Sequence, residues 1–496
     1  MKKINKIIFV GLLAVLMGCN DAIDITQPGR LDAANAFNNV EDLQLGLLGV
    51  YNEWDLTPEI ALASNFTDEV TIGFDSGGQG QALYGFQLNP ASAAASNFWV
   101  RNFRFNNRAT ILIEAAANLT VDPADQAEFN NILAQVHFLR AYANYELLIY
   151  FSTNVRDDSA LAVPVIDFIP GLGSQPSRDT TGELWDFINS DVNMAASLST
   201  EQSNPLLISG DAITAFRARL AIERGDYPTA ASLAQGLLAS YPLADRTQYQ
   251  DVFFDTDNTE IIFKLERTLN DSFDGQGATG SVNAGGWAGA RFAFVDATLA
   301  GSPYFEMDRG LFNLMDPLDI RFDVNVAPSS VINPDFENDP DPVNTDILVI
   351  QKYPGSEGQP LMNDLKVFRS SEMLLILAEA RAAQNDLSGA ADLIAQLRTA
   401  RFGSAQAAPS FGSQAEAFAG ILDERRVELS FEGHRYKDLK RLGASAGRGI
   451  ERNMIDCSLQ GNACTLPSTD FRFSLPIPVV EINGNPGIAA EQNPGY

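Results

Sequence analysis

Two similar stretches lie 160 residues apart in the chain: Leu220-Ala-Ile-Glu-Arg-Gly-Asp-Tyr-Pro-Thr-Ala-Ala-Ser-Leu233 and Ala380-Arg-Ala-Ala-Gln-Asn-Asp-Leu-Ser-Gly-Ala-Ala-Asp-Leu393. Gly225 and Asn385 occupy equivalent positions, where either residue type can end a helix in the left-handed conformation. The aspartate that follows each of them can cap a second helix. Paired alanines then allow the two helices to pack closely. The repeat predicts tetratricopeptide-like helical hairpins, which bury their apolar faces by stacking on neighbours. Chance similarity between two alanine-rich helices is the competing interpretation.

Helical periodicity extends well beyond the repeat. Apolar residues recur at i, i+3 and i+4 over residues 124–150 and again over 181–197, where Trp185 lies on the apolar face. Residues 100–116 form a further helical stretch that begins just after Trp99. The expected fold class is therefore mostly α, a superhelix of tetratricopeptide-like hairpins.

Two regions interrupt the helical pattern. Residues 55–100 are rich in Gly, Ser, Ala and Asn, and residues 265–365 are rich in Gly, Asp, Asn and Pro. Long loops inside a compact fold are usually functional or disordered. These two keep many aromatic residues, so we expect ordered, loop-rich insertions that form a ligand face. The aromatic residues are Tyr84, Phe86, Phe98, Trp99, Trp287, Phe292, Phe294, Tyr304 and Phe305.

The N-terminus has the pattern of a lipoprotein signal. Lysines at positions 2, 3 and 6 precede an apolar run over residues 7–15, which ends in Leu16-Met-Gly-Cys19. This pattern predicts a signal peptide over 1–18, lipidation of Cys19 and a lipidated tether over 19–30. An ordinary secretory signal with an accidental cysteine is the alternative.

Charge and cysteine content exclude several functions. Without its signal, the chain would carry 31 basic and 63 acidic residues, a net charge of −32. Such an acidic chain lacks the basic face that nucleic-acid phosphates or anionic lipids require. Cys457 and Cys464 are seven residues apart, and we expect them to form a disulfide in an oxidising compartment. Metal binding by this pair is the weaker alternative, because no histidine lies nearby.

Catalytic motifs are scarce. His137 and His434 are the only histidines, without His-x-x-x-His spacing, and no Gly-x-x-x-x-Gly-Lys nucleotide loop occurs. A glycosidase needs only two carboxylates, so that class stays open.

We expect the dense charges over 424–441 to pair along and between helices, with His434 packed beside them. Residues 335–346 are interpreted as a solvated acidic loop, with calcium binding as the less favoured alternative.

Several motifs together resemble the SusD/RagB family of outer-membrane nutrient-uptake lipoproteins of Bacteroidota. They occur in the family's order behind the lipoprotein signal and extend over nearly the whole mature chain. The motifs are Phe138-Leu-Arg-Ala-Tyr-Ala-Asn-Tyr-Glu-Leu-Leu148, Gly225-Asp-Tyr-Pro-Thr-Ala230, Glu260-Ile-Ile-Phe263, Phe368-Arg-Ser-Ser-Glu-Met-Leu-Leu-Ile-Leu-Ala-Glu-Ala380, Glu424 to Arg441, and Gln492-Asn-Pro-Gly-Tyr496.

The resemblance implies a surface-exposed lipoprotein of the outer membrane that binds glycan, needs no cofactor and catalyses nothing. Its partners would be an oligosaccharide or polysaccharide and a SusC-like TonB-dependent transporter, on which it acts as a lid. The SusD-like N-terminal part would span 31–260, and the C-terminal part with the variable ligand loops 261–496. A surface glycosidase and a peptide-binding uptake lipoprotein are the alternatives.

We predict the glycan contacts from residue type and from the region in which each residue lies. Sugar rings stack on aromatic faces, so the candidates are Trp287, between glycines that would leave its indole exposed, Tyr84 in a Gly-rich loop, and Trp99. Asp68 and Arg291 are the polar candidates. The acidic charge favours a neutral glucan over an anionic glycan.

Overall fold

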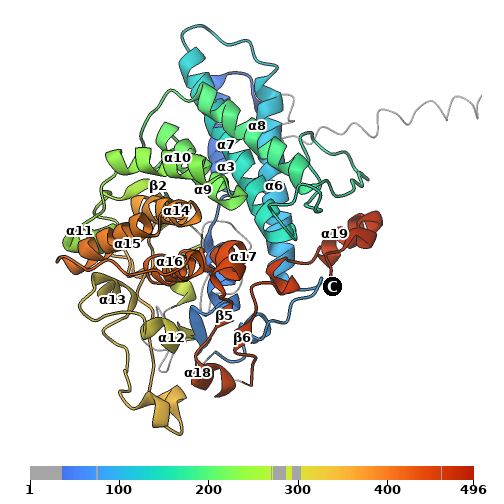
Figure 1. Ribbon diagram of the computed structural model, residues 1–496. Coiled ribbons are helices and arrows are strands. Elements are labelled where there is room, and N and C mark those ends of the chain that lie inside the picture. The colour runs from blue at the N-terminus through green and yellow to red at the C-terminus, as the bar shows by residue number, and fades with distance from the viewer. Residues whose placement is uncertain (1–35, 74–75, 270, 272–285, 293–302, 460) are drawn as a thin grey trace, which may run out of the picture.

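The computed structural model describes residues 36–73, 76–269, 271, 286–292, 303–459 and 461–496, with the side chains of 290, 291 and 459 left aside (Figure 1). The predicted signal peptide, Cys19 and the tether lie outside these residues. The described chain is mostly helical, as predicted, with a few short strands. No described helix is both long and apolar enough to cross a membrane.

The repeated stretch forms two helical hairpins. The first consists of α9 (Gly210–Arg224) and α10 (Tyr227–Ser240), and the second of α14 (Ser370–Ala383) and α15 (Leu387–Phe402). Gly225 and Asn385 both adopt the left-handed conformation, with φ of 82° and 65°. The following aspartates cap the second helix of each hairpin through the backbone N–H groups of Thr229 and Gly389. Helices α10 and α14 pack together, so the two hairpins stack as predicted.

Three long helices stand beside the hairpins in Figure 1: α6 (Ala93–Ala116), α7 (Gln126–Phe151) and α8 (Thr181–Leu198). Helix α3 (Val40–Tyr51) packs against the first two. The sequence placed the start of α6 after Trp99, whereas the helix begins at Ala93. The reason is the run of three alanines at 93–95, which are strong helix formers.

The other α-helices are shorter than α6, α7 and α8. They are α4 (Thr57–Phe66), α5 (Gln81–Tyr84), α11 (Arg246–Phe253), α12 (Arg309–Phe312), α13 (Ile320–Asn325), α16 (Gln414–Glu428), α17 (Arg435–Ala446), α18 (Met454–Leu459) and α19 (Val479–Gly484).

The described residues contain three antiparallel strand pairs, two of which join segments distant in the chain. Strand β1 (Val70–Ile72) pairs with β3 (Phe305–Met307), and β5 (Ile450–Glu451) pairs with β6 (Thr465–Leu466). Strand β2 (Ile261–Leu265) pairs with β4 (Leu365–Arg369). The variable region therefore leaves the helical body through β2 and returns to it through the neighbouring β4.

One large hydrophobic cluster runs through the molecule. It includes residues from Val40 to Ile488 and therefore draws on both segments that the sequence distinguished, 31–260 and 261–496. Trp54 illustrates the connection, because its ring lies 4.5 Å from that of Tyr142 and 5.3 Å from that of Phe263 on β2. The division at residue 260 thus does not separate two hydrophobic cores.

Candidate ligand face

The loop-rich regions gather at one end of the helical body. In Figure 1, α12, α13, α18, β5 and β6 lie together in the lower part of the view, away from α10 and the long helices. The pairing of β1 with β3 brings the loop near residue 70 to the same end. The two insertions of the sequence therefore meet in space.

Arg452 organises this end of the molecule. Its guanidinium is buried and donates hydrogen bonds to backbone carbonyl oxygens of Asn65, Phe66, Thr67, Tyr84 and Ala463. It also lies 3.7 Å from the centre of the Tyr84 ring. A planar guanidinium with five N–H donors suits several carbonyls at once. This arginine therefore fixes the path of the first insertion against the C-terminal part of the chain.

Asp68 is a buried structural residue in this arrangement. Its carboxylate accepts hydrogen bonds from Nε and Nη2 of Arg435 at 2.8 and 2.9 Å and pairs with Arg426 at 3.6 Å. Burial alone would raise the pKa of Asp68, but the two guanidinium groups hold it well below its usual range. The carboxylate is 1% exposed, so it does not present an oxygen to a ligand in this conformation.

Tyr84 is also buried. Its ring packs with Ile72 and with the pair Cys457 and Cys464, against which Phe305 also packs. The two cysteines form a disulfide, with Cα atoms 5.5 Å apart. Asp68 and Tyr84, both nominated from the sequence, are thus brought close to the same arginine, where they support the β1–β3 ribbon.

The two tryptophans have other neighbours. Trp99 packs against Phe103 and Phe151, and its Nε1 donates to Oε2 of Glu481 at 3.0 Å. This contact joins α6 to α19 and makes Trp99 part of the core. Trp287 is only 7% exposed, and it packs with Leu361 and Met362.

The expectation of an exposed indole at position 287 is therefore wrong, and the flanking glycines explain the difference. A Cβ added at Gly289 would lie 2.7 Å from the carbonyl oxygen of Leu361 and 2.8 Å from that of Tyr353. The glycine permits a close approach of two backbone segments, and this approach places Trp287 under the 353–362 loop. The indole Nε1 donates to the carbonyl oxygen of Thr268 at 3.3 Å. The backbone of Arg291 belongs to a short 3₁₀ helix over Ala288–Arg291, but its side chain lies outside the described atoms.

Tyr304 and Phe305 are the half-buried aromatic residues of the β1–β3 ribbon. The sequence placed both in the aromatic set but did not nominate them as ligand contacts. Gly80 packs directly against the Phe305 ring, since a Cβ there would lie 2.5 Å from a ring carbon. The pairing of β3 with β1, which no local sequence pattern indicates, brings these rings to the loop-rich end of the molecule.

A small polar cavity adjoins the ribbon. It measures about 20 Å³, room for roughly one water, and its lining includes Thr71, Glu306, Asp346 and Asp456. Burial raises the pKa of nearby Asp308 to about 6 and that of Asp456 well above its usual value. Within the described ranges, no group of three or more His, Cys, Asp or Glu residues is arranged to hold a metal ion.

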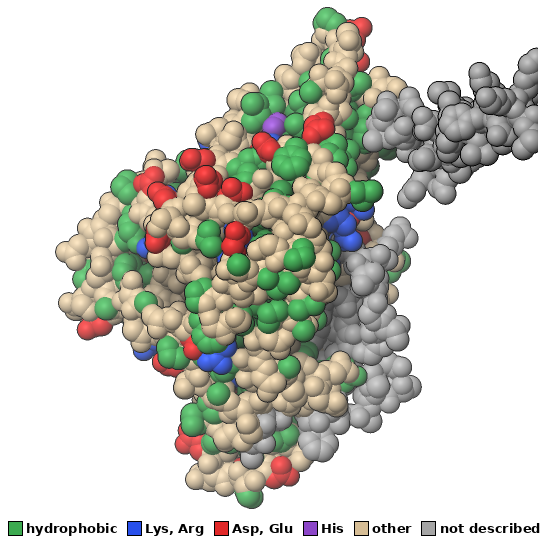
Figure 2. Space-filling view, turned by 90° about the vertical axis from the view of Figure 1, so that its right-hand side faces the viewer, with side chains coloured by type: hydrophobic (Ala, Val, Ile, Leu, Met, Phe, Trp, Pro, Cys, Tyr) green, Lys and Arg blue, Asp and Glu red, His purple; other side chains and the backbone are tan. Residues whose placement is uncertain are grey.

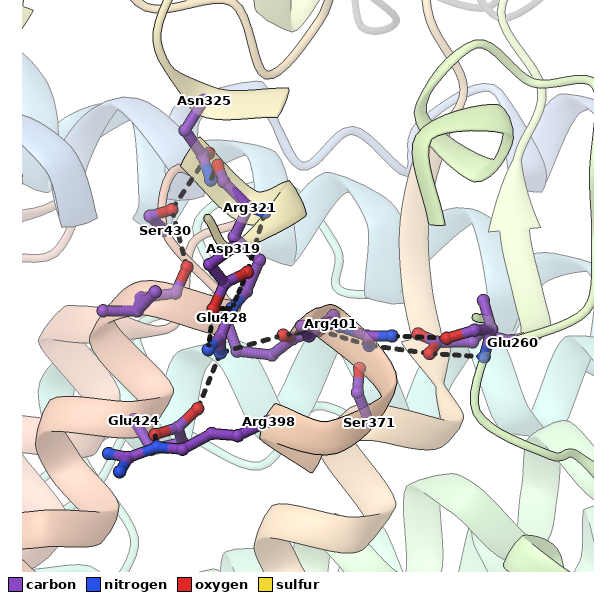
Figure 3. A network of polar contacts seen from close by, with 12 residues as sticks. Glu260, Asp319, Arg321, Asn325, Ser371, Arg398, Arg401, Glu424, Glu428 and Ser430 are labelled. Carbon is purple, nitrogen blue, oxygen red and sulfur yellow. Dashed lines mark hydrogen bonds and ion pairs between the residues drawn. The ribbon is translucent and has the colours of Figure 1, made fainter. Parts of the chain in front are cut away.

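Part of the charged motif at 424–441 lies in the buried network of Figure 3, while its Arg426 and Arg435 pair with Asp68. Glu428 accepts from Arg369 and Arg401, and its other oxygen is 3.3 Å from Arg321. Burial would raise the pKa of Glu428, but Arg401 and Arg369 hold it well below the usual value. The predicted role of these charges in helix pairing is confirmed. A fully buried, fully paired carboxylate has no route to a substrate.

Comparison with known proteins agrees with this architecture. The sequence model of the SusD family matches residues 348–496. A SusD-like protein of Formosa agariphila, P2, is 26% identical with the whole of both chains covered, and a second one, P38, is 22% identical over 89% of this chain and 92% of its own. The chain is SusD-like. The disulfide hairpin and the β4–α14 junction of this SusD-like chain both fall within the matched segment.

Solved structures support the same fold. A SusD superfamily protein from Bacteroides thetaiotaomicron has a TM-score of 0.76 at 23% identity, with 92% of this chain and 100% of that chain covered. A surface glycan-binding protein from Bacteroides fluxus has a TM-score of 0.70 at 20% identity, with the same coverage. At this level of identity, the structural likeness establishes the fold of the SusD-like chain.

Proposed function

We propose that this SusD-like chain is a non-enzymatic, lipid-anchored protein of the outer-membrane surface that binds an oligosaccharide. The observation that carries the proposal is the full-length match to a SusD-like relative, together with a fold shared with a surface glycan-binding protein. The Leu16-Met-Gly-Cys19 sequence supports the lipid anchor. The body would then project from the membrane surface, held through Cys19 and the 19–30 tether.

The second part of the proposal concerns delivery. The protein would act as the lid of a SusC-like TonB-dependent transporter and pass the captured glycan inward. Its own contribution would be binding and gating, since the energy for transport comes through TonB. Co-purification of a large outer-membrane barrel protein from native membranes, lost when the tether is deleted, is the expected result.

The ligand contacts proposed are the aromatic residues of the loop end. Trp287 and Arg291 stay in the proposal because both belong to the variable region, and the half-buried Tyr304 and Phe305 join them. Trp287 would need its covering loop to move before it could stack on a sugar. Tyr84, Trp99 and Asp68 would act by holding the loops in place, because their side chains are buried.

The test is a binding panel of neutral glucans and uronate polymers, measured by affinity electrophoresis and calorimetry with the mature protein. We expect one neutral glycan to bind and Tyr304→Ala to weaken that binding by about tenfold. The matched control is Phe168→Ala, because Phe168 is 45% exposed but belongs to the loop before α8. No binding to any glycan would refute the proposal, and the appearance of cleavage products would favour the glycosidase alternative.

A further inference from the structure

The face formed by α8, α9 and α10 carries a groove that the ligand loops do not reach. Its cavity measures about 330 Å³, within the size range of ligand sites in proteins. Helix α9 supplies the floor, and α8 and α10 supply the walls. The apolar lining is Trp185, Val192, Leu220, Ala221 and Leu233, and the polar lining is Asn189, Asn193, Arg217, Arg224, Asp226 and Thr229.

Arg217 lies where this groove meets a second one. The neighbouring cavity, of about 230 Å³, is mostly polar, and its lining includes Ser199, Thr200, Glu201, Gln202 and Thr214 together with Arg217. Arg217 is half-buried, and its Nη2 donates to Oδ1 of Asn193 at 2.5 Å. The two cavities therefore share one guanidinium at their junction.

Arg217 differs from the other two arginines of α9 in its ionic partners. Arg219, two residues along α9, is buried and forms a bidentate pair with Glu372 at 2.7 and 2.8 Å. Arg224, one turn further on, pairs with Asp158. Arg217 forms no ion pair with any residue that the structure describes, although the chain has 63 acidic and 34 basic residues.

Exposed cations are rare on this protein. On the face shown in Figure 2, Lys and Arg side chains appear at only a few places, while Asp and Glu side chains are scattered widely. A guanidinium without an ionic partner, in a groove with apolar walls, attracts a carboxylate strongly, because the two groups can form two parallel hydrogen bonds.

The apolar lining distinguishes between classes of anionic ligand. A sugar ring typically stacks on an accessible aromatic plane, but Trp185 is only 3% exposed and the other apolar residues of the lining are aliphatic. Aliphatic walls beside a guanidinium and two amide side chains suit a polypeptide whose acidic residue lies next to apolar ones. We propose that this groove binds an acidic, partly apolar polypeptide segment of a partner protein, with a carboxylate held by Arg217.

The proposal is independent of glycan binding and is tested with a displayed library of random heptapeptides, selected against the mature protein. We expect enriched peptides to carry an acidic residue with apolar neighbours. Replacing that acidic residue by its amide should weaken binding about tenfold, and Arg217→Ala should do the same, as expected for one charge-assisted contact. Arg448→Ala is the control, because Arg448 is similarly exposed but pairs with Asp423 elsewhere.

Three results would overturn the proposal: enriched peptides without acidic residues, no enrichment at all, or binding that survives Arg217→Ala. Displacement of the peptide by trigalacturonate, with the same dependence on Arg217, would assign the groove to an acidic glycan instead. Arg217 has no ion pair to lose, so its alanine variant should keep the wild-type melting temperature. Both variants should also keep glycan binding, which separates this test from that of the proposed function.

Discussion

The side chains that shape this molecule most strongly are buried charges. Arg401 is fully buried between Glu260 and Glu428, with Nη2 at 2.7 and 2.9 Å from their oxygens. Removing water from these ions is costly, and the structure offsets that cost by giving each ion several partners. Such a network holds helices in register, because any shift of one helix leaves a charge unpaired.

Loss of one cation from the network should therefore lower the free energy of unfolding strongly. We expect Arg401→Ala to lower the free energy of unfolding by about 3 kcal/mol or more, because it leaves two buried carboxylates with fewer partners. Arg381→Ala is the control from the neighbouring helix α14, since Arg381 is 35% exposed and pairs at the surface with Asp386, which is 48% exposed. Its cost should be about 1 kcal/mol or less. Urea unfolding followed by circular dichroism measures both, and equal costs would contradict the argument.

Glu69 should make stability depend on pH. Its pKa is raised from 4.5 to about 7, because the effect of burial exceeds that of the hydrogen bonds from Phe431 N–H and Ser64, which lower the pKa. Between these two values the folded state keeps a proton that the unfolded state has lost. The contribution of this group to stability therefore falls as pH rises from 4.5 to 7 and stays low above 7.

The neutral, isosteric variant Glu69→Gln removes this penalty. Relative to the wild type it should gain roughly 2 to 3 kcal/mol at pH 8, and the gain should vanish near pH 4.5, where both side chains are uncharged. Thermal unfolding at a series of pH values shows the trend. A gain that stays constant with pH, or one confined to low pH, would exclude this origin.

Sequence reasoning works unevenly at this scale. It predicted that the charges of 424–441 pair structurally, because their number and helical spacing leave few other arrangements. It failed for the exposure of Trp287, since the loop that covers this indole comes from more than 60 residues further along the chain. It did not identify Arg452, whose partners are backbone carbonyls and therefore leave no side-chain signature.

At the scale of elements, the hairpins are the most predictable part. A left-handed residue, a capping aspartate and a pair of alanines are local requirements, and each is visible in the sequence. The strand pairs were not predicted. The β1–β3 and β2–β4 pairs join segments far apart in the chain, and β1 and β3 have only three residues each, too few to show a period.

Two glycines of the first hairpin provide a test of its turn. Gly225 has φ of 82°, so Gly225→Ala should cost about 1 kcal/mol through backbone strain. Gly236 lies inside α10, and a Cβ there would meet no atom within 4 Å. Gly236→Ala should therefore stabilise the protein by about 0.5 to 1 kcal/mol through helix propensity. Opposite signs for the same substitution, measured by chemical unfolding, are the expected outcome; equal signs would mean that the turn conformation has little influence.

At the scale of the whole molecule, the lipid anchor proposed at Cys19 would decide where the protein works. We expect Cys19→Ser to move the protein from the outer-membrane fraction to the soluble fraction, because serine lacks the thiol that would carry the proposed acyl chains. Fractionation and immunoblotting detect the change. The body should keep its melting temperature, and retention of the variant in the membrane would refute the lipid anchor.

The overall architecture was predictable as a class but not as a particular shape. The stacked hairpins and the order of the motifs indicated a SusD-like body. The two insertions indicated the loops only in part, since α4, α5 and the start of α6 lie within the first insertion. How those loops meet depends on pairing between residues about 235 positions apart, such as Val70 with Met307, which a single sequence does not reveal.

The carbonyl contacts of Arg452 have a consequence for how such a protein can diversify. Every amino acid has the same main-chain carbonyl oxygen. Arg452 can therefore donate its hydrogen bonds to positions 65, 66, 67 and 463 whatever side chains they carry. Mutation can therefore alter the chemistry displayed at those positions while the anchorage persists. A scaffold of this kind can acquire new binding specificities while its loops keep the same backbone positions.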